Sequence, residues 1–121
     1  MKICISSTGE NLKSQVDPRF GRAAHLLLVD TDGNGLRQLE GATRGAHGAG
    51  IQAARSVIDA GATALVTGQI GPNAYDVLDA AGIAVYLTPG GSVEGAIQDL
   101  TGGRLEKISA PSGRPHGGTG R

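Results

Sequence analysis

The sequence predicts an α/β fold built on a five-stranded mixed sheet, three antiparallel strands followed by two parallel ones, with three helices. The 121 residues are the length of one domain. Strand-like apolar runs dominate the first forty residues, and strand-like and helix-like patterns alternate after them. Asp32-Gly33 and Asn34-Gly35, which separate two apolar runs, are strong hairpin signals. Hairpins followed by helix and strand units indicate one mixed sheet covered by helices.

The first three strands are expected at residues 2–7, 25–30 and 36–40. Ile3 and Ile5 alternate with other residues in the first run, and the second is the apolar stretch that begins at His25. Because the hairpin signal lies between the second and third runs, these two strands are expected to be antiparallel.

The rest of the chain is expected to alternate helix and strand. Apolar residues recur at helical spacing three times, Pro72 suits a first helical turn, and Ser92 is a good N-cap. The expected helices cover residues 51–60, 72–81 and 93–100, and the expected strands cover residues 63–67 and 83–87. Right-handed crossovers make these two strands parallel and place them beside the first strand. Residues 1–108 are expected to form a single domain, and the Pro- and Gly-rich residues 109–121 a flexible tail.

Composition disfavours several kinds of partner. Eleven basic and eleven acidic residues give a formal net charge of zero, which argues against nucleic acid and membrane surfaces. Phe20, Tyr75 and Tyr86 are too few and too scattered to form a base-stacking platform. The single Cys4 cannot form an internal disulfide and is expected to be buried in the first strand. The N-terminal apolar run is too short for a signal peptide or a membrane span, so we expect a cytoplasmic protein.

Signatures of catalysis are missing as well. The first strand and the strand at residues 63–67 contain no Asp or Glu, which disfavours the carboxylate cluster of a two-metal nuclease. No Gly-x-Ser-x-Gly segment is present, and the spacing of Gly45, Gly48 and Gly50 differs from that of dinucleotide-binding loops. These absences disfavour a nuclease, a hydrolase and a nucleotide-binding protein.

The loops favour capture of an anion. In sheets of this kind ligands bind at the carboxyl ends of the parallel strands, which are rich here in glycine and hydroxyl groups. Unpaired amides at helix N-termini attract negative charge, and arginine side chains can close over it with forked donors. The residues expected to bind the ligand are Arg19, Arg22, Arg44, His47, Gly48, Gly50, Gly68, Gln69, Gly71, Asn73 and Gly91.

One histidine is a candidate metal ligand. His47 lies within a glycine-rich loop, where an imidazole can reach a metal or a sulfide, although a solvated loop residue is the alternative interpretation. His25 begins a strand and is expected on the surface or facing the hairpin. His116 belongs to the expected tail, and no role is assigned to it.

Four segments resemble the dinitrogenase iron–molybdenum cofactor biosynthesis family. They are residues 16–23 (VDPRFGRA), 48–54 (GAGIQAA), 67–74 (TGQIGPNA) and 81–86 (AGIAVY), followed by Gly91-Ser92-Val93 and Ala96-Ile97. The segments occur in order over about residues 1–102. The resemblance implies a ribonuclease H-like three-layer fold without nuclease chemistry. Within the family the chain most resembles the orange protein branch of sulfate-reducing bacteria, which is also a stand-alone domain.

The resemblance also implies a function, and makes residues 1–108 a single metal-cluster-binding domain. It points to a non-enzymatic carrier of a preformed, anionic, molybdenum-containing metal–sulfur cluster, either a molybdenum–copper sulfide or an iron–molybdenum cofactor-like cluster. Such a cluster brings its own sulfides. Backbone amides, arginines and one imidazole of the protein can therefore hold it noncovalently without Cys4. The alternatives are a regulatory domain that binds a small anion and an interaction module in a cluster delivery, redox or cell-division complex.

Overall fold

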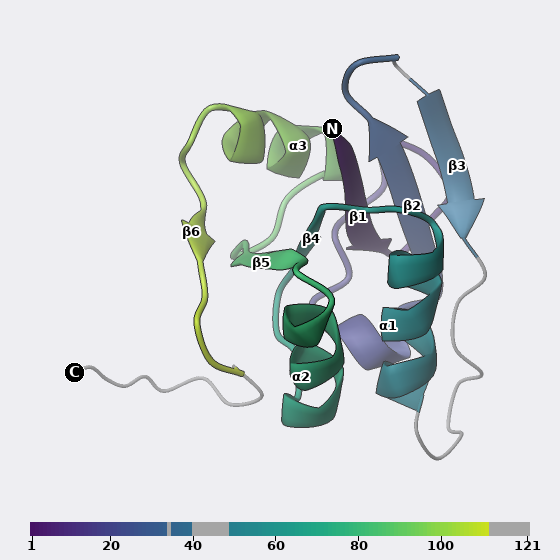
Figure 1. Cartoon of the computed structure of the whole chain (residues 1–121). Coiled ribbons are helices and arrows are strands. Elements are labelled where there is room, and N and C mark those ends of the chain that lie inside the picture. Colours follow the sequence, from purple (N-terminus) through teal and green to yellow (C-terminus); the bar gives the residue numbers. More distant parts are fainter. Residues whose placement is uncertain (34, 40–48, 112–121) are drawn as a thin grey trace.

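The computed structural model describes residues 1–33, 35–39 and 49–111 as a mixed sheet with helices on both faces (Figure 1). In chain order the elements are β1 (Lys2–Ser7), the short 3-10 helix η1 (Phe20–Arg22), β2 (His25–Asp30), β3 (Gly35–Leu39), α1 (Ala49–Asp59), β4 (Ala64–Thr67), α2 (Pro72–Ala80), β5 (Ala84–Leu87), α3 (Val93–Thr101) and β6 (Glu106–Lys107). No helix in this described part is long and apolar enough to cross a membrane.

The strand order β3-β2-β1-β4-β5-β6 confirms the predicted topology. The pairs β1–β2 and β2–β3 are antiparallel, as the hairpin signal required. The pairs β1–β4 and β4–β5 are parallel, as expected for right-handed crossovers. The carboxyl ends of β1, β4 and β5 therefore lie along one edge of the sheet.

The predicted strand count was wrong, because the sheet has six strands rather than five. The sixth, β6, is antiparallel to β5 and pairs Lys107 with Tyr86. The pairing continues where the Ile108 amide donates to the Val85 carbonyl at 2.9 Å. Both residues of β6 are exposed and show no apolar alternation, so the backbone hydrogen bonds alone define this strand.

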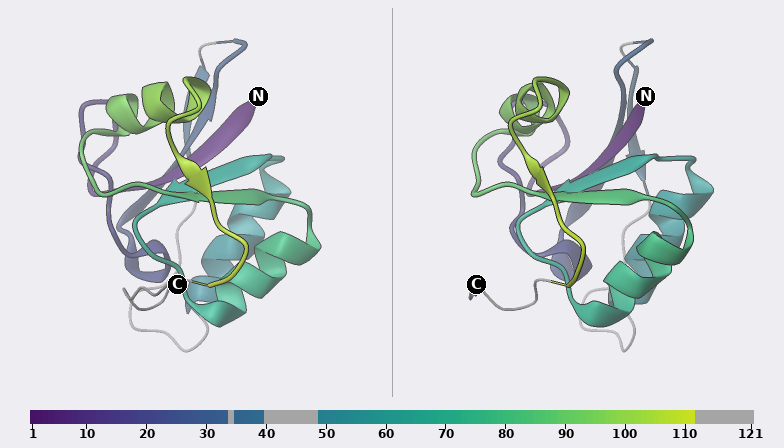
Figure 2. Two further views of the ribbon diagram at one scale, coloured as in Figure 1. Left: turned by 90° about the vertical axis from the view of Figure 1, so that its left-hand side faces the viewer. Right: turned by 60° about the vertical axis from the view of Figure 1, so that its left-hand side comes forward.

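Alternating side chains divide the core between the two faces of the sheet. Cys4 in β1 packs with residues of α1 and α2, whereas Ile3 and Ile5 pack with residues of α3. Figure 2 shows α3 on one face and α1 and α2 on the other. This arrangement is the expected three-layer fold, and both faces of the central strands are covered.

The expected helix ends are largely confirmed. Pro72 occupies the first turn of α2, and the Ser92 hydroxyl caps α3 by accepting a hydrogen bond from the Gly95 amide at 3.0 Å. Gly61 and Gly82 follow α1 and α2 with φ near +80°, a conformation that favours glycine at helix ends. The division into a domain and a tail stays a prediction, since residues 112–121 lie outside the described part.

Candidate anion-binding site

Buried hydroxyl groups mark the edge where the parallel strands end. Ser6 at the end of β1 and Thr67 at the end of β4 are both fully buried. The Ser6 Oγ lies 2.8 Å from the Thr67 Oγ1 and 2.7 Å from the Asp17 carbonyl oxygen. The Asp17 amide in turn donates to the Ser6 carbonyl at 2.9 Å. The segment after Val16 is thus tied to the carboxyl end of β1.

This segment carries two of the expected ligand-binding residues. The Arg19 amide donates to the Asp17 Oδ1 at 3.0 Å, which turns the backbone. Arg19 then forms a parallel bridge with Gln69, and the Phe20 amide donates to the Gln69 carbonyl at 3.3 Å. The Phe20 ring is buried in the core beneath α1 and α2. Its burial anchors η1 and leaves the two arginines on either side at the surface.

Two glycine contacts allow the segments to approach so closely. A Cβ on Gly68 would lie 2.7 Å from the Pro18 Cα and 2.8 Å from the Pro18 carbonyl oxygen, so no other residue fits without movement. A Cβ on Gly21 would lie 3.1 Å from the Gly50 Cα in the first turn of α1. Close backbone packing rather than an unusual φ therefore requires glycine at position 68. At position 21 a larger residue would need the two backbones to separate by a few tenths of an ångström.

A groove of about 230 Å³ lies where these segments meet. Its lining consists of Arg19, Phe20, Gly21, Arg22, Gln69, Ile70 and Gly71. This lining contains two cationic side chains and no carboxylate. Both arginines are exposed, and neither guanidinium makes an ion pair or a hydrogen bond within residues 1–33, 35–39 and 49–111.

The N-terminus of α2 borders the groove through Gly71. Gly71 is the N-cap of this helix and offers no side chain to its amides, and the first turn contains no acidic residue. The amides of a helix N-terminus and the helix dipole favour negative charge. Together with the two guanidiniums, this positive helix end makes the groove suitable for an anion.

The groove brings together four of the residues expected from the sequence: Arg19, Arg22, Gln69 and Gly71. Gly50 and Gly68 lie behind it, at the close contacts just described. Asn73 is exposed in the first turn of α2 and does not line the groove. Arg44, His47 and Gly48 lie outside the described residues, so their roles stay predictions.

Gly91 belongs to a neighbouring loop rather than to the groove. Its carbonyl accepts a hydrogen bond from the Val16 amide at 2.8 Å, and its φ of +97° favours glycine. The sequence analysis missed Phe20, Gly21 and Ile70 as groove residues. The signal for them was present, because all three lie within the segments that resemble the family.

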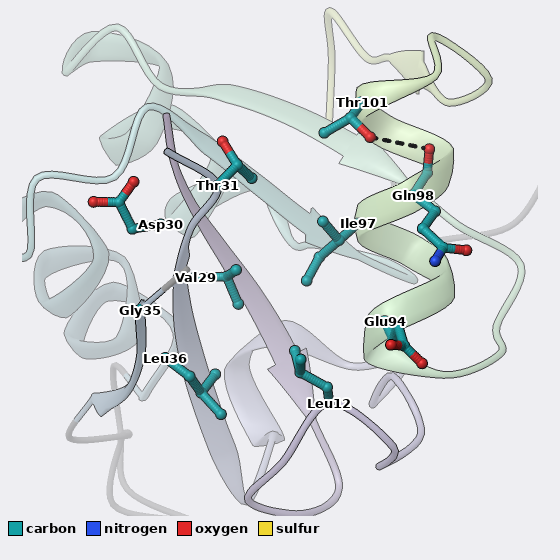
Figure 3. Close-up of a pocket in the computed structure, with 10 residues that line it drawn as sticks. All are labelled: Leu12, Val29, Asp30, Thr31, Gly35, Leu36, Glu94, Ile97, Gln98 and Thr101. Carbon is teal, nitrogen blue, oxygen red and sulfur yellow. Dashed lines mark hydrogen bonds between the residues drawn. The ribbon is translucent and has the colours of Figure 1, made fainter. Parts of the chain in front are cut away.

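A second groove of about 460 Å³ lies on the opposite face, between α3 and the β2–β3 hairpin (Figure 3). Leu12, Val29, Leu36 and Ile97 point into it, and its lining includes Asp30 and Glu94 but no cation. Although this groove is larger, it lacks the positive charge that an anionic ligand requires. The groove lined by Arg19 and Arg22, called the arginine groove, is therefore the candidate site.

The described residues do not form a conventional metal centre. No group of three or more His, Cys, Asp and Glu side chains in the described part of the chain could hold a metal ion. His25 instead contacts the Gln38 side chain across the hairpin, as expected for a residue that faces it. Cys4 is fully buried, as predicted, and burial raises the pKa of its thiol to about 12.

The raised pKa predicts that Cys4 is unreactive in the folded protein. Since the thiolate is the reactive form, we expect no labelling by Ellman's reagent at pH 8 until denaturant is added. The folded-state pKa exceeds the ordinary value of 9.0. Ionisation of Cys4 therefore leaves the free energy of unfolding unchanged below pH 9 and lowers it as the pH rises from 9 toward 12. The decline is about 1.4 kcal/mol per pH unit and should be absent in Cys4→Ala. Rapid labelling without denaturant would contradict the burial.

Comparison with known proteins identifies the family. The family model for dinitrogenase iron-molybdenum cofactor matches residues 1–103, which is most of the chain. The chain belongs to the dinitrogenase iron-molybdenum cofactor family. This assignment confirms the resemblance noted from the sequence. An uncharacterized protein from Methanocaldococcus jannaschii is 31% identical over 112 residues, which are 89% of this chain and 92% of that protein.

Two solved structures are similar to this chain over most of its length. The apo form of the orange protein from Desulfovibrio gigas has a TM-score of 0.83 and 34% identity, with 92% of this chain and 95% of that chain covered. A putative NifB protein from Thermotoga has a TM-score of 0.81 and 35% identity, with 90% and 94% covered. Both proteins thus share this three-layer fold.

Proposed function

We propose that this protein is a non-enzymatic carrier that binds a preformed, anionic, molybdenum-containing metal–sulfur cluster in the arginine groove. The observation that carries the proposal is the position of Arg19 and Arg22 beside the Gln69–Gly71 loop, in a groove whose lining has no carboxylate. The family match and the similarity to the orange protein support this ligand class.

The chemistry of the groove suits a cluster that arrives fully assembled. The two guanidiniums supply charge-assisted hydrogen bonds, and the positive end of the α2 dipole beside Gly71 favours the same negative charge. None of these groups bonds covalently to a metal. The cluster would therefore be held noncovalently through its outer sulfides, with Cys4 protonated and buried in the core.

The molybdenum–copper sulfide cluster is the specific ligand that we propose first, and an iron–molybdenum cofactor-like cluster is the second. His47 would add a metal ligand from the glycine-rich loop before α1. Delivery to a protein partner in the cytoplasm completes the proposal. None of these finer points is required for the groove to bind an anion.

The test is reconstitution under anaerobic conditions. Apoprotein is mixed with tetrathiomolybdate and copper, and gel filtration then separates protein from free metal. Colour and stoichiometric molybdenum and copper should elute with this protein, but not with a colourless control protein of equal size and charge. A protein peak without colour or molybdenum would contradict the molybdenum–copper proposal.

A regulatory domain that binds a small anion is the second candidate. The groove volume of about 230 Å³ is compatible with a compact anionic metabolite. Such a ligand would raise the melting temperature, because it binds preferentially to the folded state. It would add no visible chromophore. Stabilisation by small carboxylates and phosphates, with no response to thiomolybdate, would favour this alternative.

A further inference from the structure

Two buried hydroxyl groups connect the ends of β1 and β4 to the segment Asp17–Arg22 and do not line the groove. Ser6 and Thr67 are fully buried, are 61 residues apart in sequence, and lie 2.8 Å apart at their oxygens. Neither residue lines the groove. Apolar residues would fill these two strand positions without the desolvation cost of a hydroxyl, so the pair calls for an explanation beyond packing.

The number of hydroxyl protons determines which oxygen donates in each of these two hydrogen bonds. The Ser6 hydroxyl has one proton and two acceptors within reach, the Asp17 carbonyl at 2.7 Å and the Thr67 hydroxyl at 2.8 Å. All three oxygens are satisfied if Thr67 donates to Ser6 and Ser6 donates to the Asp17 carbonyl. Removal of either hydroxyl leaves a buried polar group with one partner fewer.

This series of hydrogen bonds ends at Asp17, the residue that orients the segment carrying Arg19 and Arg22. Asp17 is held on both sides, because its carbonyl accepts from Ser6 Oγ and its amide donates to the Ser6 carbonyl. The Asp17 carboxylate in turn accepts from the Arg19 amide at 3.0 Å. A displacement of Asp17 would therefore move Arg19 with it, and with Arg19 the bridge to Gln69.

We propose that Ser6 and Thr67 are positioning residues, whose hydroxyl pair holds the Asp17–Arg22 segment where its two guanidiniums can bind the same anion. The proposal rests on the proposed function, in that it assumes an anionic ligand in the groove. It adds that affinity depends on two side chains that do not contact this ligand. Residues that orient metal-binding groups from behind have comparable effects in other proteins.

The first arm of the test needs no ligand. Amide hydrogen exchange at Phe20 reports whether the segment stays paired with Gln69, because the Phe20 amide donates to that carbonyl. Ser6→Ala should speed this exchange relative to the amides of β2, and Thr67→Val should do so to a smaller extent. Thr67→Ser retains the hydroxyl and should restore slow exchange. Ile3→Val, at the other end of β1 and packed on the α3 face, is the matched control for lost stability.

The second arm measures the dissociation constant for tetrathiomolybdate and the circular dichroism of the bound chromophore. Ser6→Ala should weaken binding about tenfold and alter the spectrum, whereas Thr67→Ser and Ile3→Val should stay within about twofold of wild type. Equal weakening by Ile3→Val, or unchanged affinity in Ser6→Ala, would overturn the positioning role. A wild-type protein that binds tetrathiomolybdate neither alone nor with copper would instead contradict the molybdenum–copper form of the proposed function. The exchange arm would then decide by itself whether the hydroxyl pair holds the segment.

Discussion

Gly68→Ala should destabilise the protein by about 3 kcal/mol, the upper end of the usual cost of overpacking. The added methyl group would lie 2.7 Å and 2.8 Å from backbone atoms of Pro18, and backbone cannot move aside as a flexible side chain can. To relieve the contact, the segment before Arg19 must separate from the loop after β4. We therefore expect a lower urea midpoint and weaker tetrathiomolybdate binding together.

Gly71→Ala is the matched control for stability. Gly71 belongs to the same loop, has an extended φ of −77°, and has open space where a Cβ would lie. Its replacement should lower the unfolding free energy by less than about 1 kcal/mol, because alanine is a poorer N-cap than glycine but creates no steric contact. Equal unfolding free energies for Gly68→Ala and Gly71→Ala would show that the close approach of Pro18 and Gly68 is not required for the fold.

The double variant Arg19→Ala/Arg22→Ala should bind tetrathiomolybdate about 100-fold more weakly than wild type. Each hydrogen bond to a charged group contributes about 1.5 kcal/mol, so the loss of one at each arginine gives about that factor. The unfolding free energy should stay nearly constant, because both side chains are exposed and have no partner in the described part of the chain. Isothermal titration at two salt concentrations measures both the affinity and its salt dependence. Added salt should weaken the wild type more than the variant, since exposed charges are screened.

The control variant Arg37→Ala/Arg55→Ala removes the same charge elsewhere. Both residues are exposed, one in β3 and the other in α1, and neither lines the arginine groove. Its affinity should stay within about threefold of wild type, since its charges act on the ligand only through screened solvent. A loss equal to that of Arg19→Ala/Arg22→Ala would indicate general attraction to a positive surface rather than a site.

The fold was predictable because its signals are local. The Asp-Gly and Asn-Gly pairs predicted the β2–β3 hairpin, and helical spacing with Pro72 and Ser92 predicted α2 and α3. The parallel placement of β4 beside β1 followed from the handedness of crossovers. The strand β6 was missed because its two exposed residues pair only through backbone atoms, which leave no pattern in the sequence.

The candidate site was predictable in part. Its position at the carboxyl ends of the parallel strands follows from topology, and this rule selected Gln69 and Gly71, while side-chain charge selected Arg19 and Arg22. The rule could not distinguish Gly91 from the groove residues. Gly91 also follows a parallel strand, but its carbonyl accepts a hydrogen bond from Val16 instead. Both loops obey the same local pattern, and only their packing differs.

By itself, the sequence determined the order of strands and helices, the neutral overall charge, and the glycine and arginine content of the loops. Spacing and composition encode these properties within a few residues of chain. Only the tertiary structure decided which loops meet. The contact of Gly68 with Pro18, that of Gly21 with Gly50, and the Ser6–Thr67 hydroxyl pair join segments that are distant in sequence. Their geometry depends on the packing of the whole sheet, and this packing places two arginines over one groove.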